Sequence, residues 1–385
     1  MSVTTAPAAT PAAHAAVAGG TIVFLLSRSR HARMWRRVKR VRPGFFRHDV
    51  LAFDRDPTPA EFGPYTSLGS ITHGRYFRRL VHLLQAFRLI RHRLQLADTA
   101  YCFSLDLLLI AWLARRRGPR PVRLVYEVAD IRPLFTQRTA LAGLVRALER
   151  WLVRQAAVVV LTSPEFYTGY FAEVQRLQGF PHVVIQHKPE VPRETRERME
   201  RRVRAPHTFR IGYFGLMKSV PSFEVLATAA ARYPHLEFVF RGIFVAPLDA
   251  RECLDRIAQH ANLTYGGPYR SPEDLATLYG GVDLVWDAYT GTDNSRWQRT
   301  TRFSEAMYFK RPVITDAATP DGRSTRAHGV GLCLDLGDAP AAVAALGRLN
   351  DADYHRWCDA VEHLPDDLLF YGDEYRELHR HLTRA

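Results

Sequence analysis

The sequence has few of the residues that build disulfide or metal frameworks. It contains only four cysteines among 385 residues, and these lie far apart, at Cys102, Cys253, Cys333 and Cys358. This spacing excludes the paired motifs of structural zinc sites and gives no sign of a disulfide framework. We therefore expect a protein of a reducing compartment, the cytoplasm, without a bound metal.

Long apolar runs are also missing. No stretch of about eighteen apolar residues occurs, so we expect no transmembrane helix. The first twenty residues are rich in Ala, Pro and Thr, and they lack the basic and bulky apolar regions of a signal peptide. We expect residues 1–20 to form a disordered tail.

Several familiar catalytic signatures are absent. The chain has no glycine-rich dinucleotide motif after a strand, no P-loop, no HExxH and no GxSxG. These absences weaken the hypotheses of a dehydrogenase, a kinase and a serine hydrolase, and no cofactor is expected.

Acidic residues are under-represented, and the net charge is +14. The imbalance is strongest between residues 28 and 47, where no acid occurs beside Arg28, Arg30, Arg33, Arg36, Arg37, Lys39, Arg40, Arg42 and Arg47. Such a surplus indicates an anionic partner, which is nucleic acid, a membrane surface or a phosphorylated substrate.

What the sequence does contain is a repeated alternation of strand-like and helix-like segments. The predicted strands are residues 21–27, 48–54, 98–104, 122–128, 156–163 and 182–188, and then 209–215, 236–242, 262–267, 282–289, 312–316 and 329–336. Amphipathic segments of helical length lie between them. This alternation predicts an α/β fold with two parallel sheets covered by helices.

A proline-flanked, charged segment without apolar periodicity separates the two halves and is interpreted as a linker. The predicted divisions are a tail at 1–20, an N-terminal domain at 21–190, the linker at 191–207, a C-terminal domain at 208–360 and a helical segment at 361–385. In such folds, ligands bind in the cleft beyond the carboxyl ends of the strands.

Two predicted helix starts carry cations where the helix dipole disfavours them. Arg299 and Arg302 precede Glu305 at one start, and Lys218 follows Gly215 at the other. A bound anion between the cations and the helix amides would make both arrangements favourable, and two such starts would hold a diphosphate. The alternatives are a plain turn with a solvated lysine, and a weak Arg302–Glu305 pair worth about 0.3 kcal/mol.

The second half resembles glycosyltransferases of the GT-B fold, in particular glycosyltransferase family 4. The matching segments are residues 211–219, 236–242, 263–286 and 302–315. The first half resembles the bacterial exopolysaccharide transferases of succinoglycan type, through residues 73–80, 103–116, 124–133 and 147–166, together with 293–297. The resemblance covers nearly the whole chain after residue 20.

The resemblance implies two Rossmann-like domains whose parallel sheets face a central cleft. It implies that Lys218 and Glu305 hold the diphosphate and the ribose of a nucleotide-sugar donor. The further donor-binding candidates are Gly215, Asn294 and Arg302, with Tyr269 and Arg270 in the loop beside the base or ribose. Asn294 has the alternative of a turn asparagine.

The chain departs from the family pattern at three places. Trp297 stands where the family has its first glutamate, and Leu216 stands where an arginine precedes the lysine. Arg302 is the candidate for that missing charge. The family's cleft histidine has no clear match, and the nearby carboxylates Asp130 and Glu127 are the catalytic candidates.

The sequence leaves the catalytic step open. In an inverting enzyme Asp130 would be the base, whereas in a retaining one the leaving phosphate takes the proton itself. The alternative for Asp130 is a helix N-cap.

A basic amphipathic segment at residues 74–96 is a candidate for contact with an anionic membrane at the inner face of the plasma membrane. Its apolar face is Leu80, Leu83, Leu84, Phe87 and Ile90, flanked by Arg75, Arg78, Arg79, Arg88, Arg91 and Arg93. The alternative is that this face packs on the first sheet.

The sequence therefore predicts a metal-independent glycosyltransferase of bacterial exopolysaccharide or capsule synthesis. It would move a sugar from a nucleotide-diphosphate sugar to a saccharide acceptor, expected to be lipid-linked. Two other hypotheses stay open, a nucleotide-sugar epimerase of the same fold and a non-catalytic basic protein that binds membrane or nucleic acid. We expect no nucleic-acid partner, because no aromatic-basic RNA motif occurs.

Overall fold

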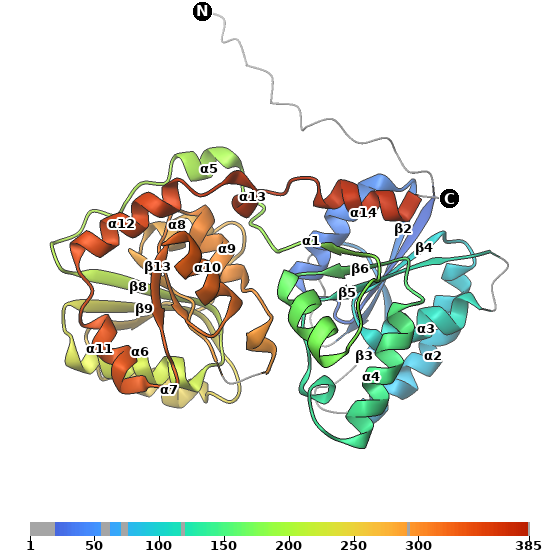
Figure 1. Cartoon of the computed structure of the whole chain (residues 1–385), viewed down its shortest axis with the longest axis horizontal. Helices are drawn as coiled ribbons and strands as arrows, with labels where there is room; N and C mark the ends of the chain where they lie inside the picture. The colour runs from blue at the N-terminus through green and yellow to red at the C-terminus, as the bar shows by residue number, and fades with distance from the viewer. Residues whose placement is uncertain (1–19, 55–61, 71–75, 117–119, 291–292, 384–385) are drawn as a thin grey trace, which may run out of the picture.

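The fold consists of two α/β units that lie side by side in a computed structural model (Figure 1). The structure describes residues 20–54, 62–70, 76–116, 120–290 and 293–383. The predicted disordered tail lies outside the described residues, apart from Gly20. Among the helices that are described, none combines the length and the apolar character needed to cross a bilayer.

The first unit is built on a seven-stranded parallel sheet with the order β3-β2-β1-β4-β5-β6-β7. Its strands are β1 (Thr21–Leu26), β2 (Arg47–Asp54), β3 (Thr66–Ser70), β4 (Thr99–Cys102), β5 (Arg123–Val128), β6 (Val158–Leu161) and β7 (His182–Val184). The sequence predicted all of these except β3, a short polar strand at the edge of the sheet.

Successive residues of the central strands point to opposite faces of the sheet. Both sets of side chains are apolar and buried, because helices cover both faces. Val23 and Leu25 of β1 pack with the helices on one face, while Ile22 and Phe24 pack on the other. The elements of this unit are α1 (Ala32–Val41), η1 (Arg42–Gly44), α2 (Tyr76–Leu94), α3 (Leu105–Arg115), η2 (Pro133–Phe135), α4 (Ala140–Val153) and the π-helical η3 (Phe166–Val174).

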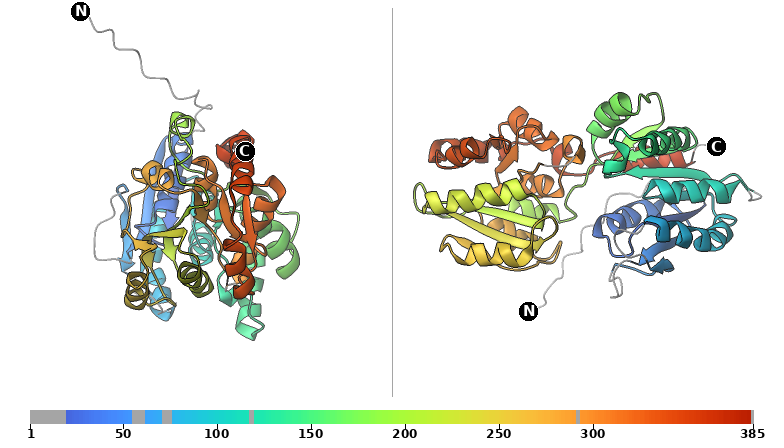
Figure 2. Two further views of the ribbon diagram at one scale, coloured as in Figure 1. Left: turned by 90° about the vertical axis from the view of Figure 1, so that its left-hand side faces the viewer. Right: turned by 90° about the horizontal axis from the view of Figure 1, so that it is seen from below.

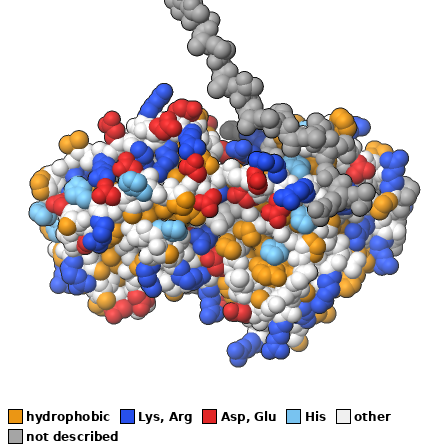
Figure 3. Space-filling view, turned by 45° about the horizontal axis from the view of Figure 1, so that its top comes forward, with side chains coloured by type: hydrophobic (Ala, Val, Ile, Leu, Met, Phe, Trp, Pro, Cys, Tyr) orange, Lys and Arg blue, Asp and Glu red, His pale blue; other side chains and the backbone are white. Residues whose placement is uncertain are grey.

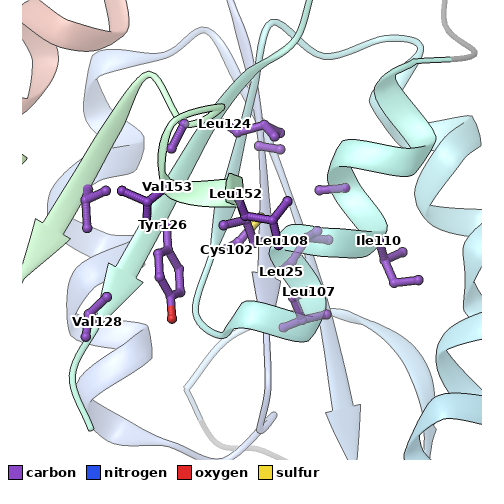
Figure 4. Close-up of a cluster of buried hydrophobic side chains, with 14 of the residues drawn as sticks. Leu25, Cys102, Leu107, Leu108, Ile110, Leu124, Tyr126, Val128, Leu152 and Val153 are labelled. Carbon is purple, nitrogen blue, oxygen red and sulfur yellow. The ribbon is translucent and has the colours of Figure 1, made fainter. Parts of the chain in front are cut away.

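The larger core of the first unit joins β1, β4 and β5 to α3 and α4. Figure 4 shows Leu25 and Cys102 from the sheet close to Leu108 and Leu152 from the helices. The described part of the basic segment 74–96 belongs to this core as well, because Ala86, Ile90 and Leu94 of α2 are buried in it. For these residues, the alternative that the apolar face packs on the first sheet is confirmed. The side chains of residues 76–81, 83 and 84 lie outside what the structure describes.

The second unit has a six-stranded parallel sheet with the order β10-β9-β8-β11-β12-β13. Its strands are β8 (Phe209–Met217), β9 (Leu236–Phe244), β10 (Leu263–Tyr265), β11 (Leu284–Trp286), β12 (Val313–Asp316) and β13 (Gly331–Leu334). Its helices are α6 (Val220–Arg232), α7 (Ala250–Ala258), α8 (Leu275–Gly280), η4 (Asp293–Arg296), α9 (Thr301–Tyr308), α10 (Pro320–His328), α11 (Ala339–Leu346) and α12 (Asp351–Glu362).

The end of the chain divides between the two units. The short helix α13 (Asp366–Leu369) lies against α9 of the second unit, whereas α14 (Glu374–Thr383) returns to α1, β6 and β7 of the first (Figure 2). Leu378 and Leu382 of α14 are buried in the core of the first unit. The final segment therefore covers one face of the first sheet.

The segment between the sheets is fastened to the second unit. It contains one short helix, α5 (Arg193–Glu197), and the buried guanidinium of Arg196 donates to the carbonyl oxygens of Met307, Tyr308 and Val361. The Arg196 guanidinium therefore satisfies its hydrogen-bonding groups with three carbonyl oxygens and needs no acidic partner.

The surface carries charges of both signs. Figure 3 shows that positive and negative side chains are interspersed on the face turned to the viewer.

Residues 293–299 of the second unit contact the first unit. Trp297 is buried in the core of the first unit, 5.6 Å from the ring of Tyr170 between ring centroids. Gly169 makes room for it, since a Cβ there would lie 2.4 Å from the Trp297 indole nitrogen. The Arg299 guanidinium also pairs with Glu165 at 2.9 Å. The residue that departs from the family pattern is thus a packing residue between the units.

Replacing Trp297 by alanine should reduce the free energy of unfolding by about 3–5 kcal/mol, because it empties a site in the core of the other unit. Urea denaturation followed by circular dichroism measures this. Trp151→Ala is the control, since that side chain is 37% exposed and should cost clearly less. Equal losses for the two variants would show that Trp297 does not join the units.

Candidate functional site

A cavity of about 540 Å³ lies where the carboxyl end of β8 and the amino ends of α6 and α9 face α1 of the first unit. Five of the predicted donor-binding residues line it together, namely Gly215, Lys218, Tyr269, Arg302 and Glu305. The sequence places these residues on separate β-α connections. They meet because parallel strands deliver their carboxyl ends to one edge of the sheet.

Strand β8 requires glycine near its carboxyl end. Gly215 has φ +94°, a left-handed value that residues with a side chain rarely adopt. The neighbouring Gly242 of β9 lies against it, since a Cβ on Gly242 would be 2.0 Å from the Gly215 carbonyl oxygen. Lys218 follows, exposed and without an ion-pair partner among the described residues, directly before the N-cap Ser219 of α6. The backbone is therefore open to a ligand here, and a cation is free beside it.

The N-cap of helix α9 is Thr300, whose hydroxyl accepts from the Phe303 amide at 2.9 Å. The helix ends at Tyr308, before Lys310 turns to φ +55°. The predicted strand after Pro312 is β12.

Arg302 pairs with a buried acid, so the alternative of an Arg302–Glu305 pair is wrong. Its guanidinium lies 3.6 Å from the Asp287 carboxylate, donates to the Trp286 carbonyl at 3.0 Å and stacks over the Tyr213 ring. Arg302 is therefore held rigidly at the wall of the cavity, with part of its charge already balanced.

Glu305 is buried, and one of its carboxylate oxygens accepts from the Tyr279 hydroxyl at 2.8 Å. Burial raises the pKa of Glu305, while the Tyr279 hydrogen bond and the nearby arginines oppose that rise. A carboxylate has room for about four hydrogen bonds. Glu305 can therefore accept further hydrogen bonds from a ligand in the cavity.

One wall of the cavity comes from the first unit, and the sequence did not predict it as part of the site. Arg36 of α1 reaches it from the first unit, and its charge acts on the pKa values of both Glu305 and Tyr269. Leu216, which replaces the family's arginine, lines the same cavity. The only sequence signal for Arg36 was its place among nine cations without an acid.

Asp130 and Asn294 meet at the contact between the units and lie outside the set of residues that line the cavity. The Asn294 amide donates to Asp130 at 3.3 Å and its oxygen accepts from the Ile131 amide at 2.8 Å. Asp130 also pairs with Arg33 at 3.3 Å and keeps about half of its side chain exposed. The N-cap of the following η2 is Arg132, so the alternative of Asp130 as a helix cap is wrong.

Glu127 is placed differently from the other candidates. Its carboxylate is buried inside the first unit, 2.9 Å from the Arg37 guanidinium and 2.6 Å from the Tyr101 hydroxyl. Arg37 in turn donates to the Tyr375 hydroxyl of α14 and to the Ile185 carbonyl. This network joins α1, the sheet and α14, and it gives Glu127 a structural position away from the cavity.

Arg270 is separated from its neighbour Tyr269. Its exposed guanidinium pairs with Asp274 at 2.9 Å, and it does not line the cavity, whereas Tyr269 does. The predicted loop beside the base or ribose is therefore represented in the cavity by Tyr269 and Ser271.

Two buried carboxylates that sequence reasoning missed support the start of α9. Asp287 follows β11 and accepts from the Thr300 hydroxyl at 2.8 Å, while Asp321 accepts from the Thr300 amide at 2.9 Å and from the Tyr289 hydroxyl at 3.3 Å. Burial raises the pKa of Asp321 to about 6. Burial and the neighbouring Asp321 also raise the pKa of Asp287 well above its usual value.

The raised pKa of Asp321 predicts how the stability of the variant Asp321→Asn depends on pH. Because the folded state holds the proton more tightly than the unfolded one, whose pKa is near 3.8, the wild type loses stability as the pH rises from about 4 to 6. The contribution of Asp321 to this loss is absent when the side chain cannot ionise, so the variant should lose less stability than the wild type over this range. Urea denaturation of both proteins between pH 4 and pH 7 checks this. Parallel stability curves would contradict the assignment.

Comparison with known proteins bears on this geometry. No family model matches the chain. It is similar to the succinoglycan biosynthesis protein ExoL of Rhizobium meliloti, with 26% identity over 310 residues that cover 77% of this chain and 75% of that protein.

Solved structures share the fold across 94% of this chain. HepE of Anabaena, in complex with UDP and glucose, has a TM-score of 0.66 at 16% identity over 99% of its own chain. Sucrose-phosphate synthase of Thermosynechococcus elongatus has 0.65 at 14% over 98%, and the lipopolysaccharide outer core galactosyltransferase WaaB has 0.61 at 14% over 99%. The predicted GT-B fold and the resemblance to a succinoglycan-type protein are confirmed.

Proposed function

We propose that the protein is a glycosyltransferase that uses a nucleotide-diphosphate sugar in bacterial exopolysaccharide synthesis. The observation that carries the proposal is the cavity itself, in which Glu305 faces cations contributed by both units. Similarity to ExoL supports the place in exopolysaccharide synthesis, and the complex of HepE with UDP and glucose supports a nucleotide-sugar donor.

The donor binds with its diphosphate between Lys218 and Arg36. Arg302, held by Asp287, lies behind it, and Glu305 accepts hydrogen bonds from the ribose hydroxyls. Tyr269 lies beside the ribose or base. Cations and helix amides placed around a leaving diphosphate stabilise the negative charge that develops during transfer, so no metal is needed in this scheme.

Asp130 is the proposed base for the hydroxyl of the acceptor, if transfer inverts the anomeric centre. It lies at the carboxyl end of β5, half exposed and oriented by Asn294 and Arg33. Such a base accepts the proton as the new glycosidic bond forms. Glu127 has no part in this step, since it is buried against Arg37. The acceptor is a lipid-linked saccharide, and the enzyme works in the cytoplasm at the inner face of the plasma membrane.

Donor binding is tested by thermal shift with UDP, ADP, GDP and their sugars. A ligand present at one hundred times its Kd stabilises the folded protein by about 2.7 kcal/mol, so the true donor raises the melting temperature. If none of these compounds changes the melting temperature, the proposal fails.

Lys218→Ala and Arg36→Ala should each weaken binding of the nucleotide diphosphate about 10- to 100-fold, because each removes a charge-assisted contact with phosphate. Lys39→Ala is the matched control, since Lys39 is an exposed cation of the same helix α1 and does not line the cavity. Calorimetric titration measures the three affinities. If Arg36→Ala and Lys39→Ala bind alike, the diphosphate does not reach the first unit.

Asp130→Asn should lower sugar transfer about 10²- to 10⁴-fold while the thermal shift with nucleotide is retained, as for loss of a general base. Arg33→Ala removes the ion pair and keeps the carboxylate, so it should cost far less. Equal losses in the two variants would assign Asp130 to positioning. Conversion of the donor to an epimer without any acceptor would instead identify an epimerase.

A further inference from the structure

Helix α4 of the first unit carries an apolar stripe that faces solvent. Leu141 and Leu144 are 60% and 68% exposed, and Trp151 is 37% exposed. The spacing of three and then seven residues places all three on one face of the helix. We propose that this face docks on a bilayer of acidic phospholipids.

The stripe is one of two groups of exposed apolar side chains among the described residues. The other is Leu216 with its cross-strand partner Ile243, near Val220, and it belongs to the edge of the cavity already described, whereas Phe46 and Val203 lie on separate elements. Single exposed apolar residues are ordinary, whereas a contiguous group marks an interaction surface. Trp151 extends the group to α3, because its ring packs edge-on against Trp112 at 4.4 Å.

The side chains that border the stripe are positively charged, which favours an acidic partner. Arg138 and Arg154 are exposed at its two ends, and the Arg116 guanidinium stacks over Trp112 at 4.6 Å. Between residues 133 and 155 the only acid is Glu149, which is buried and accepts from Tyr126 and Tyr170. An apolar face bordered by arginines without exposed acids complements acidic lipid headgroups.

The same charges disfavour a second copy of the chain as the occupant. A symmetric dimer would bring the same patch of both copies together, and its arginines would then face each other. On a bilayer, the leucines and Trp151 enter the boundary of the headgroups, and the arginines contact lipid phosphates with their aliphatic stems along the apolar surface.

The stripe also lies near the contact between the units. Helix α4 follows η2, and the hydroxyl of Thr136, between them, is hydrogen-bonded to Asp293 of the second unit. Figure 1 shows α4 at the lower edge of the first unit, on the side away from α14. A bilayer on this face therefore leaves the α14 face free and lies beside the start of the segment 293–299.

Co-sedimentation with vesicles tests the proposal. The full-length protein should bind vesicles of phosphatidylcholine with about 30% phosphatidylglycerol, and 0.5 M NaCl should weaken that binding because it screens the arginines. Leu141→Ser with Leu144→Ser should lower the partition coefficient at least about tenfold, since two leucine side chains no longer enter the apolar boundary. The control is Phe46→Ser with Leu96→Ser, which changes two exposed apolar residues elsewhere and should bind as the wild type does.

Several results would overturn the proposal. They are absence of binding to the acidic vesicles, binding of the Leu141/Leu144 variant that equals the wild type, and a wild-type dimer that this variant dissociates. Circular dichroism verifies that the variant is folded. The inference rests on the membrane location given under the proposed function, but its test is separate from that of donor binding, because the variant should keep the thermal shift with the nucleotide. A wild type that binds vesicles and ignores every nucleotide would contradict the proposed function alone.

Discussion

The site depends on how the segment 293–299 of the second unit is seated in the first. Trp297 fills a place in the core of the first unit that the absent side chain of Gly169 leaves open, and Arg299 pairs with Glu165 beside it. This contact joins the two units. Lys218 and Arg36 come from different units, so they can serve one ligand only while the contact holds them on one cavity.

Electrostatics divides the cations of the site into two kinds. Arg302 is fixed by Asp287, which is itself part of a buried carboxylate pair with a raised pKa. Lys218 has no ion-pair partner among the described residues, so its charge stays available to a ligand. Arg36 of the other unit lines the same cavity as Leu216, so the proposed scheme gives it, rather than the already paired Arg302, the charge that is missing at Leu216. Trp297 is a packing residue between the units.

The proposed activity and the proposed docking surface use the two units differently. The second unit offers helix starts and glycine turns to the donor. The first unit offers Asp130 to the acceptor and the α4 stripe to the bilayer that would carry a lipid-linked acceptor. Arg36 and the Asp130–Asn294 contact join these tasks at the boundary between the units.

The sequence by itself determined the architecture and the donor edge of the second sheet. Strand periodicity identified every strand except β3, whose polar edge position has no apolar pattern. Gly215, Lys218, Arg302 and Glu305 were predicted as one site because the carboxyl ends of parallel strands lie at the same edge of a sheet. Only the tertiary structure decided which groups from distant segments meet. The burial of Glu127 against Arg37, the approach of Arg36 and the place of Trp297 are contacts across the sheet or between the units, and no local pattern records them.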